Sequence, residues 1–180
     1  GEPALLSFEN VETTFHEFGH ALHGFFANQK YESLSGTSVA RDFVEFPSQF
    51  NENWATHPEV LQNYALHYET GEVIPKTLLK KIKNAGTFNQ GYALIENLCS
   101  SSLDMKWHTI TTASEVNNVA SFENSVLDKM QLDLEEIPPR YRSTYFAHIF
   151  SGGYAAGYYS YLWTEMLSHD AYDWFRNNGL

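Results

Sequence analysis

A His-Glu-x-x-His motif constrains the fold of this 180-residue chain more than any other feature. It reads His16-Glu17-Phe18-Gly19-His20. Side chains four residues apart share one face of an α-helix, so both imidazoles can reach one ion only if this segment is helical. Apolar residues recur around the motif at helical spacing, at Val11, Phe15, Phe18, Leu22 and Phe25. This periodicity predicts a helix over residues 8–27, with Ser7 as its N-cap.

The motif indicates a zinc site. Glu17 is offset by about 100° from His16, so it can touch a water on the ion without ligating the ion itself. A catalytic zinc needs a third protein ligand and one open position for water, whereas a structural zinc usually has four protein ligands and favours cysteine. A chance match on a solvated or structural helix is the alternative, but buried histidines without partners would be costly there.

The sequence offers more than one third ligand. His23 follows the motif on nearly the same helix face, but we interpret it as a packing or supporting residue. Glu45 is the better candidate, because it lies in the apolar segment 43–46 and needs a counter-charge, which Zn²⁺ would supply. The residues alone leave Asp42 as an alternative ligand, and a salt bridge between Glu45 and Arg41 as the explanation without a metal.

The rest of the chain is typical of a mainly α-helical domain. We expect further helices at 42–56, 58–70, 75–84, 88–110, 119–132 and 154–176. The segment 31–35 alternates weakly and predicts a short strand, and the pair Pro138-Pro139 stops helix formation. With no internal repeat and no linker-like tract, the chain has the length of one domain, over residues 1–180.

Composition excludes several classes of function. Lys plus Arg is 11 against 22 for Asp plus Glu, a formal charge of -11, so neither nucleic acid nor an anionic membrane is an expected partner. The single cysteine, Cys99, cannot form an internal disulfide. No apolar run has the length of a membrane span, and Gly1-Glu2-Pro3 does not begin a signal peptide. We expect a cytoplasmic protein, with the periplasm as the alternative.

Two groups of side chains are candidates to contact a substrate. Tyr154, Tyr158 and Tyr161 fall at i, i+4 and i+7, which would place three phenol hydroxyls on one face of the expected last helix. Such hydroxyls suit donation to a developing oxyanion, and an aromatic core stripe is the alternative. Arg140 and Arg142 are either binders of a substrate carboxylate or a solvated surface pair.

These motifs resemble the thimet-oligopeptidase-like family of zinc peptidases. The resemblance is carried by the runs 16–24, 41–49 and 51–54, and the run from Ser35 to Pro58 is most similar to the family's bacterial peptidyl-dipeptidase (dipeptidyl carboxypeptidase) branch. It covers essentially the whole chain. It implies a helical zincin-type catalytic core with at most a short strand near the active site, in which Glu45 joins His16 and His20 as the third ligand of one Zn²⁺.

The resemblance also implies a reaction. Short peptides would be hydrolysed by a zinc-bound water, with Glu17 as the general base. The residues His148, Tyr154 and Tyr161 match the histidine and two tyrosines that line the site in this family, where a phenol hydroxyl would stabilise the oxyanion. On proximity alone, and not from the resemblance, Asp42 and Gln49 are candidates to orient an imidazole.

The resemblance implies the release of C-terminal dipeptides. An endo-acting oligopeptidase of the same family is the alternative, and a non-catalytic peptide-binding module is the alternative from a different class. Members of the family are several times longer than this chain, and their substrate channel lies between the catalytic half and a helical half that precedes the zinc motif. We therefore expect residues 1–180 to be the catalytic core of a longer two-lobed peptidase, with the missing N-terminal helical lobe as a partner.

Overall fold

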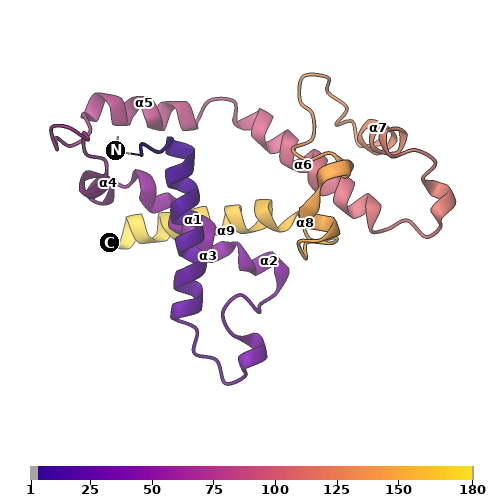
Figure 1. Ribbon diagram of the computed structural model, residues 1–180, viewed down its shortest axis with the longest axis horizontal. Coiled ribbons are helices and arrows are strands. Elements are labelled where there is room, and N and C mark those ends of the chain that lie inside the picture. Colours follow the sequence, from indigo (N-terminus) through magenta and orange to yellow (C-terminus); the bar gives the residue numbers. More distant parts are fainter. Residues whose placement is uncertain (1–3, 180) are drawn as a thin grey trace. The chain divides into compact units, whose positions relative to one another are not determined.

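A computed structural model describes residues 4–179 and confirms the expected mainly helical fold (Figure 1). Among these residues the only extended pairing is an isolated antiparallel bridge between Leu66 and Val73. No described helix combines the length and apolarity that a membrane span requires. Residues 1–3, on which the signal-peptide expectation bears, and residue 180 lie outside the described part of the chain.

The described residues form two compact units, and each is presented by itself. The first unit comprises the chain up to Phe88 together with the segment from Trp163 onward, and the second comprises Asn89–Leu162. The expectation that residues 1–180 act as one catalytic core stays a prediction.

The first unit is built around α1 and α3. Its helices are α1 (Phe8–Phe25), α2 (Arg41–Val44), α3 (Phe46–Glu52), α4 (Pro58–Tyr64), α5 (Lys76–Gly86) and most of α9 (Ser160–Asn178). The α1 helix begins as predicted, because the Ser7 hydroxyl accepts a hydrogen bond from the Asn10 backbone N–H at 3.2 Å. The α1 and α3 helices pack against each other (Figure 1).

The contact between α1 and α3 depends on a glycine inside the motif. Gly19 is buried, and a Cβ atom there would lie 2.6 Å from both the Pro47 carbonyl oxygen and the Ser48 Cα. Close by, the Asn51 side-chain amide donates to the Phe15 carbonyl oxygen at 2.6 Å. The two helix backbones therefore approach closely, which brings the segment before α3 next to the motif.

Three predictions in this unit are wrong. The helix expected over 58–70 ends at Tyr64, and Leu66 instead pairs with Val73 in an antiparallel bridge. The expected helix over 42–56 is interrupted at Glu45, and a 3₁₀ helix over Asn53–Thr56 replaces its last turn. The cause is Pro47, which has no N–H to bond the carbonyl four residues earlier and whose ring clashes with it. The expected strand at 31–35 is instead a 3₁₀ turn, Glu32–Leu34.

The second unit contains α6 (Gln90–Trp107), α7 (Val119–Lys129) and α8 (Ala147–Phe150). One core cluster joins α6 to α7 through Cys99, Leu103, Val126 and Leu127. A second cluster consists of Phe146, Ile149 and Tyr158.

The predicted start of the last helix, at residue 154, is wrong, because α9 begins at Ser160. The preceding segment adopts turns, with positive φ angles at Gly153 (80°) and Ala156 (53°). A right-handed helix cannot pass through such residues. Tyr154 and Tyr158 therefore lie before the helix, and only Tyr161 lies on it.

Candidate metal centre

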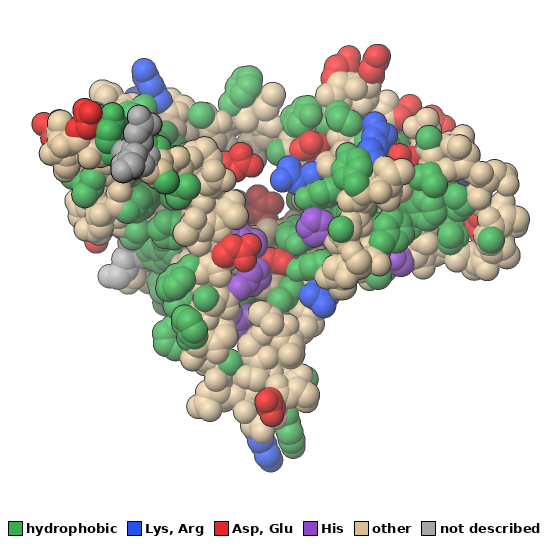
Figure 2. Space-filling view, in the orientation of Figure 1, with side chains coloured by type: hydrophobic (Ala, Val, Ile, Leu, Met, Phe, Trp, Pro, Cys, Tyr) green, Lys and Arg blue, Asp and Glu red, His purple; other side chains and the backbone are tan. Residues whose placement is uncertain are grey.

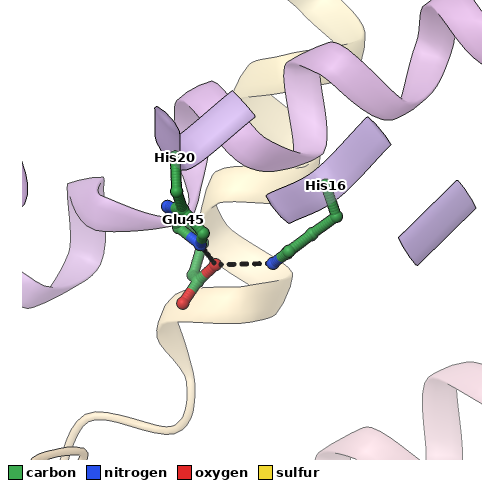
Figure 3. Close-up of side chains that lie close together, drawn as sticks. All are labelled: His16, His20 and Glu45. Atoms are coloured by element: carbon green, nitrogen blue, oxygen red, sulfur yellow. Dashed lines mark ion pairs between the residues drawn. The ribbon is translucent and has the colours of Figure 1, made fainter. Parts of the chain in front are cut away.

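Three side chains of the first unit converge on one point. His16 and His20 project from α1, and Glu45 lies at the break between α2 and α3. The Nε2 atoms of both histidines are 3.2 Å from Oε2 of Glu45 (Figure 3). One potential ligand atom from each residue lies within 4.8 Å of the others. Glu45, rather than Asp42, completes this group.

The three side chains fit a zinc ion in both chemistry and spacing. Zinc is bound in proteins by imidazole nitrogens and carboxylate oxygens at about 2.0–2.2 Å, and two ligands of a tetrahedral ion are then about 3.3–3.6 Å apart. The two nitrogen–oxygen distances of 3.2 Å are close to the short end of this range. Two histidines and one glutamate leave a fourth position, as catalytic zinc sites require.

Burial strengthens the case that Glu45 needs a cation. Its side chain is only 3% exposed, and an ionised carboxylate in such a place is costly unless it is paired. The Ser48 hydroxyl donates to Oε2 of Glu45 at 3.0 Å and to its carbonyl oxygen at 2.8 Å. The histidines are less buried, with 21% of the His16 side chain and 24% of the His20 side chain exposed. Figure 2 shows histidine side chains (purple) at the surface beside α1, next to acidic side chains (red).

A second carboxylate orients His16, and the sequence-based reasoning missed it. Oε1 of Glu52 lies 2.5 Å from His16 Nδ1, on the opposite side of the ring from Glu45. A metal-binding histidine commonly donates its other ring N–H to a carboxylate, which fixes the ring orientation. Local sequence carries no signal for this contact, because it forms only when α1 and α3 pack against each other. The sequence suggested Asp42 and Gln49 as residues that orient an imidazole. The side chain of Gln49 accepts a hydrogen bond from the Thr164 hydroxyl at 2.6 Å.

The two carboxylates also change the acidity of His16. Burial lowers the pKa of this imidazole, but the hydrogen bonds to Glu45 and Glu52 outweigh burial and raise the pKa to about 9 in the metal-free protein. Without metal, the ring therefore carries a proton at neutral pH. A divalent cation would take the place of this proton between the three side chains.

The surroundings of His20, His23 and Glu17, which share α1 with His16, complete the description of this helix. Nδ1 of His20 is buried and has no hydrogen-bond partner among the described residues. The His23 ring packs edge-on against Phe43, with ring centroids 6.3 Å apart. Glu17 is exposed on α1, so its carboxylate is accessible to water.

The second unit gathers His148, Tyr154 and Tyr161. The two tyrosine rings are stacked with centroids 5.3 Å apart, and the His148 ring is 6.2 Å from Tyr154 and 6.3 Å from Tyr161. Tyr158 is 3% exposed and belongs to the core, and burial raises the pKa of its phenol. The tyrosines cluster, but a turn brings them together, so the prediction that all three share one face of the last helix is wrong.

The two arginines considered for substrate binding form ion pairs inside the second unit. Arg140 Nη1 lies 3.8 Å from a Glu96 carboxylate oxygen, and Arg142 Nη1 lies 3.7 Å from a Glu123 carboxylate oxygen. Both side chains are partly exposed, so these pairs are compatible with either of the two interpretations.

Comparison with known proteins agrees with the resemblance that the sequence motifs carry. The family model described as peptidase family M3 matches residues 1–180. The dipeptidyl carboxypeptidase of Escherichia coli strain K12 is 56% identical over 179 residues, which cover 99% of this chain and 26% of that protein. The Salmonella typhimurium dipeptidyl carboxypeptidase is 55% identical with the same coverage, and the oligopeptidase A of that bacterium is 40% identical over 100% of this chain and 26% of its own length. The chain thus spans about a quarter of the length of these relatives.

Proposed function

Because this chain belongs to peptidase family M3, we propose that it carries the zinc site of a metallopeptidase that hydrolyses peptide bonds in short peptides. His16, His20 and Glu45 would hold one Zn²⁺. The observation that carries the proposal is the pair of 3.2 Å distances from Oε2 of Glu45 to the two imidazole Nε2 atoms. Two such distances around a buried carboxylate are close to the edge of a zinc tetrahedron.

Each residue near this centre has a proposed part in the reaction. When bound, zinc would supply Lewis acidity, which lowers the pKa of water and polarises the scissile carbonyl. Glu17 would accept the proton of the attacking water and pass it to the leaving amine. Its exposed position on the same helix as both histidines supports this role. Glu52 would hold His16 in the orientation that its Nε2 needs.

The oxyanion that forms on the scissile carbonyl needs hydrogen-bond donors. We assign this role to the hydroxyl of Tyr154 or Tyr161, with His148 beside them. The stacking of the two tyrosines and the nearby imidazole support the assignment. The substitutions Tyr154→Phe and Tyr161→Phe each keep the ring and remove only the hydroxyl, and kcat should fall by about 10²–10³-fold in the variant that loses the donor.

The proposed cleavage releases dipeptides from the C-terminus of the substrate. The relatives named dipeptidyl carboxypeptidase are 55–56% identical to this chain, against 40% for an oligopeptidase A, and this difference favours the release of C-terminal dipeptides. A peptidyl-dipeptidase needs the free C-terminal carboxylate, whereas an endo-acting oligopeptidase does not. Equal cleavage of free-acid and amidated forms of one peptide would therefore exclude a peptidyl-dipeptidase.

The rest of the longer protein is also part of the proposal. A helical lobe preceding residue 1 would form the other wall of the substrate channel, as the family resemblance implies. A cytoplasmic location and the exclusion of nucleic acid as a partner stay predictions from the sequence.

The test of the function uses the complete protein that contains this chain. A Glu17→Gln variant should keep one zinc per chain and lose turnover, because the amide cannot accept a proton. A quenched peptide reports turnover and elemental analysis reports zinc. Substantial residual kcat would remove Glu17 from the role of base. A zinc-loaded wild-type protein that binds the peptide without cleaving it would favour the peptide-binding module.

A further inference from the structure

A buried carboxylate of the second unit lies next to the tyrosine cluster and has no part in the mechanism above. Asp104, on α6, is 0% exposed. Its Oδ1 accepts a hydrogen bond from the Ala156 backbone N–H at 2.9 Å, and its Oδ2 accepts one from the Tyr158 backbone N–H at 2.8 Å. Both oxygens are thus used by backbone groups more than fifty residues away in sequence.

The segment that Asp104 binds is a turn that needs external support. Residues 151–159 join α8 to α9 without regular structure. Local hydrogen bonds shape the turn, from Tyr154 N–H to the His148 carbonyl (2.9 Å) and from Gly157 N–H to the Tyr154 carbonyl (2.8 Å). Ala156, however, has φ of 53°. A non-glycine residue holds such a conformation only where its surroundings enforce it.

The surroundings of Asp104 compensate the cost of burying a charge. Hydrogen bonds to an ionised carboxylate are stronger than those between neutral groups. His108, the C-cap residue that follows α6, adds a third partner, with Nδ1 2.8 Å from Oδ1 of Asp104. The recorded contacts of this carboxylate are thus made either with the turn or with the C-cap of its own helix.

We infer that Asp104 is a positioning residue, which fixes the turn over residues 151–159 and thereby sets the positions of Tyr154 and Tyr161. The route is short. The Tyr158 backbone is tied to Asp104, the Tyr158 ring packs 5.0 Å from the Tyr161 ring, and the latter stacks on Tyr154 at 5.3 Å. The catalytic consequence rests on the proposed function, in which these phenols donate to the oxyanion.

The test compares two buried carboxylates of the second unit in the complete, zinc-loaded protein. An Asp104→Asn side chain keeps its size but has one acceptor oxygen, and its NH₂ group faces a backbone N–H. The control is Glu123→Gln, because Glu123 is 5% exposed and accepts the Ser143 backbone N–H at 2.6 Å, outside the turn. Hydrogen exchange at individual amides and steady-state kinetics are measured on both variants.

In Asp104→Asn, exchange should accelerate at the Ala156 and Tyr158 amides. Its kcat should fall between about ten-fold and about a hundred-fold, because small misplacements of donors are that costly, while KM changes little. In Glu123→Gln, exchange should accelerate at Ser143 and kcat should be retained. Unchanged exchange at the two turn amides of Asp104→Asn would overturn the inference, and so would an equal loss of kcat in both variants.

A second variant and a second readout keep the test of Asp104 falsifiable. If Asp104→Asn does not fold, His108→Gln removes the third partner of Asp104 together with the 3.3 Å contact between His108 Nδ1 and the Ala156 N–H. The Tyr158 amide, whose recorded acceptor is Asp104, then decides, and its exchange should accelerate to a smaller extent than in Asp104→Asn. No acceleration there would refute the anchoring role. If the wild-type protein has no peptidase activity, the proposed function fails, and the exchange data still decide whether Asp104 fixes the turn.

Discussion

Replacing Gly19 by alanine tests whether the close approach of α1 and α3 builds the metal centre. The new Cβ would lie 2.6 Å from the Pro47 carbonyl oxygen and from the Ser48 Cα, where ordinary contacts begin at 3.4 Å. The helices must therefore separate by about 0.8 Å, the difference between these two distances. Both contacting atoms belong to the backbone, so no side chain can rotate away.

The magnitude follows from three contributions. Overpacking a tight contact costs about 1–3 kcal/mol. Weakening the hydrogen bond from Asn51 to the Phe15 carbonyl costs about 1 kcal/mol more. Alanine regains about 1 kcal/mol through its better helix propensity. We expect Gly19→Ala to lower the free energy of unfolding by about 1–3 kcal/mol.

Zinc binding should respond more sharply than stability. Glu45 directly precedes α3, so a shift of about 0.8 Å would stretch its 3.2 Å distances to the imidazoles beyond the edge of a zinc tetrahedron. The control is Gly24→Ala on the same helix, where a Cβ meets nothing within 4 Å. This control should keep zinc affinity and gain up to about 1 kcal/mol.

The assay combines urea unfolding, followed by circular dichroism, with competitive zinc titration. Gly19→Ala should lose both stability and zinc affinity, and Gly24→Ala should lose neither. If Gly19→Ala binds zinc as tightly as the wild type, the argument that helix approach sets the ligand geometry is refuted.

Four further predictions concern the surroundings of the centre. Glu52→Gln should weaken zinc binding by about 10–100-fold, because it removes the carboxylate on His16 Nδ1, and unchanged affinity in a chelator competition would contradict that role. Because the pKa of His16 is raised to about 9 in the metal-free protein, zinc binding near pH 7.5 should release close to one proton, and zinc affinity should rise with pH up to about 9. Calorimetry in buffers of different ionisation enthalpy measures the released proton. A result of no released proton would count against this prediction. The same raised pKa stabilises the metal-free fold fully below about pH 6.5 and progressively less toward pH 9, which urea unfolding at several pH values measures. Ser48→Ala should cost about 1–2 kcal/mol of stability, since it leaves the buried Glu45 carboxylate with one hydrogen bond fewer, and a neutral effect on unfolding would contradict this.

The first helix was predictable because every local signal agreed. Apolar periodicity, the Ser7 cap and the spacing of the histidines all favour one helix, and it forms over Phe8–Phe25. The fit of Glu45 to the histidines was foreseen from its apolar neighbours and from the family resemblance. The break that places Glu45 beside them was not foreseen, although Pro47 is a local signal for it.

The parts that escaped prediction depend on contacts distant in sequence. Helical spacing suggested that Tyr154, Tyr158 and Tyr161 share one helix face. The turn that carries Tyr154 and Tyr158 is held by Asp104, about fifty residues earlier. Such a contact cannot be predicted from the residues near the turn. Glu52 was missed for a similar reason, since its contact with His16 exists only once α1 and α3 have packed.

The central claim is that His16, His20 and Glu45 hold a zinc ion, and anomalous diffraction at the zinc absorption edge tests it most directly. In crystals of the complete protein, the account predicts one peak within about 2.0–2.2 Å of both imidazole Nε2 atoms and a Glu45 carboxylate oxygen. A zinc peak bound elsewhere, or one that includes the histidines but leaves Glu45 outside the ligand set, would contradict it.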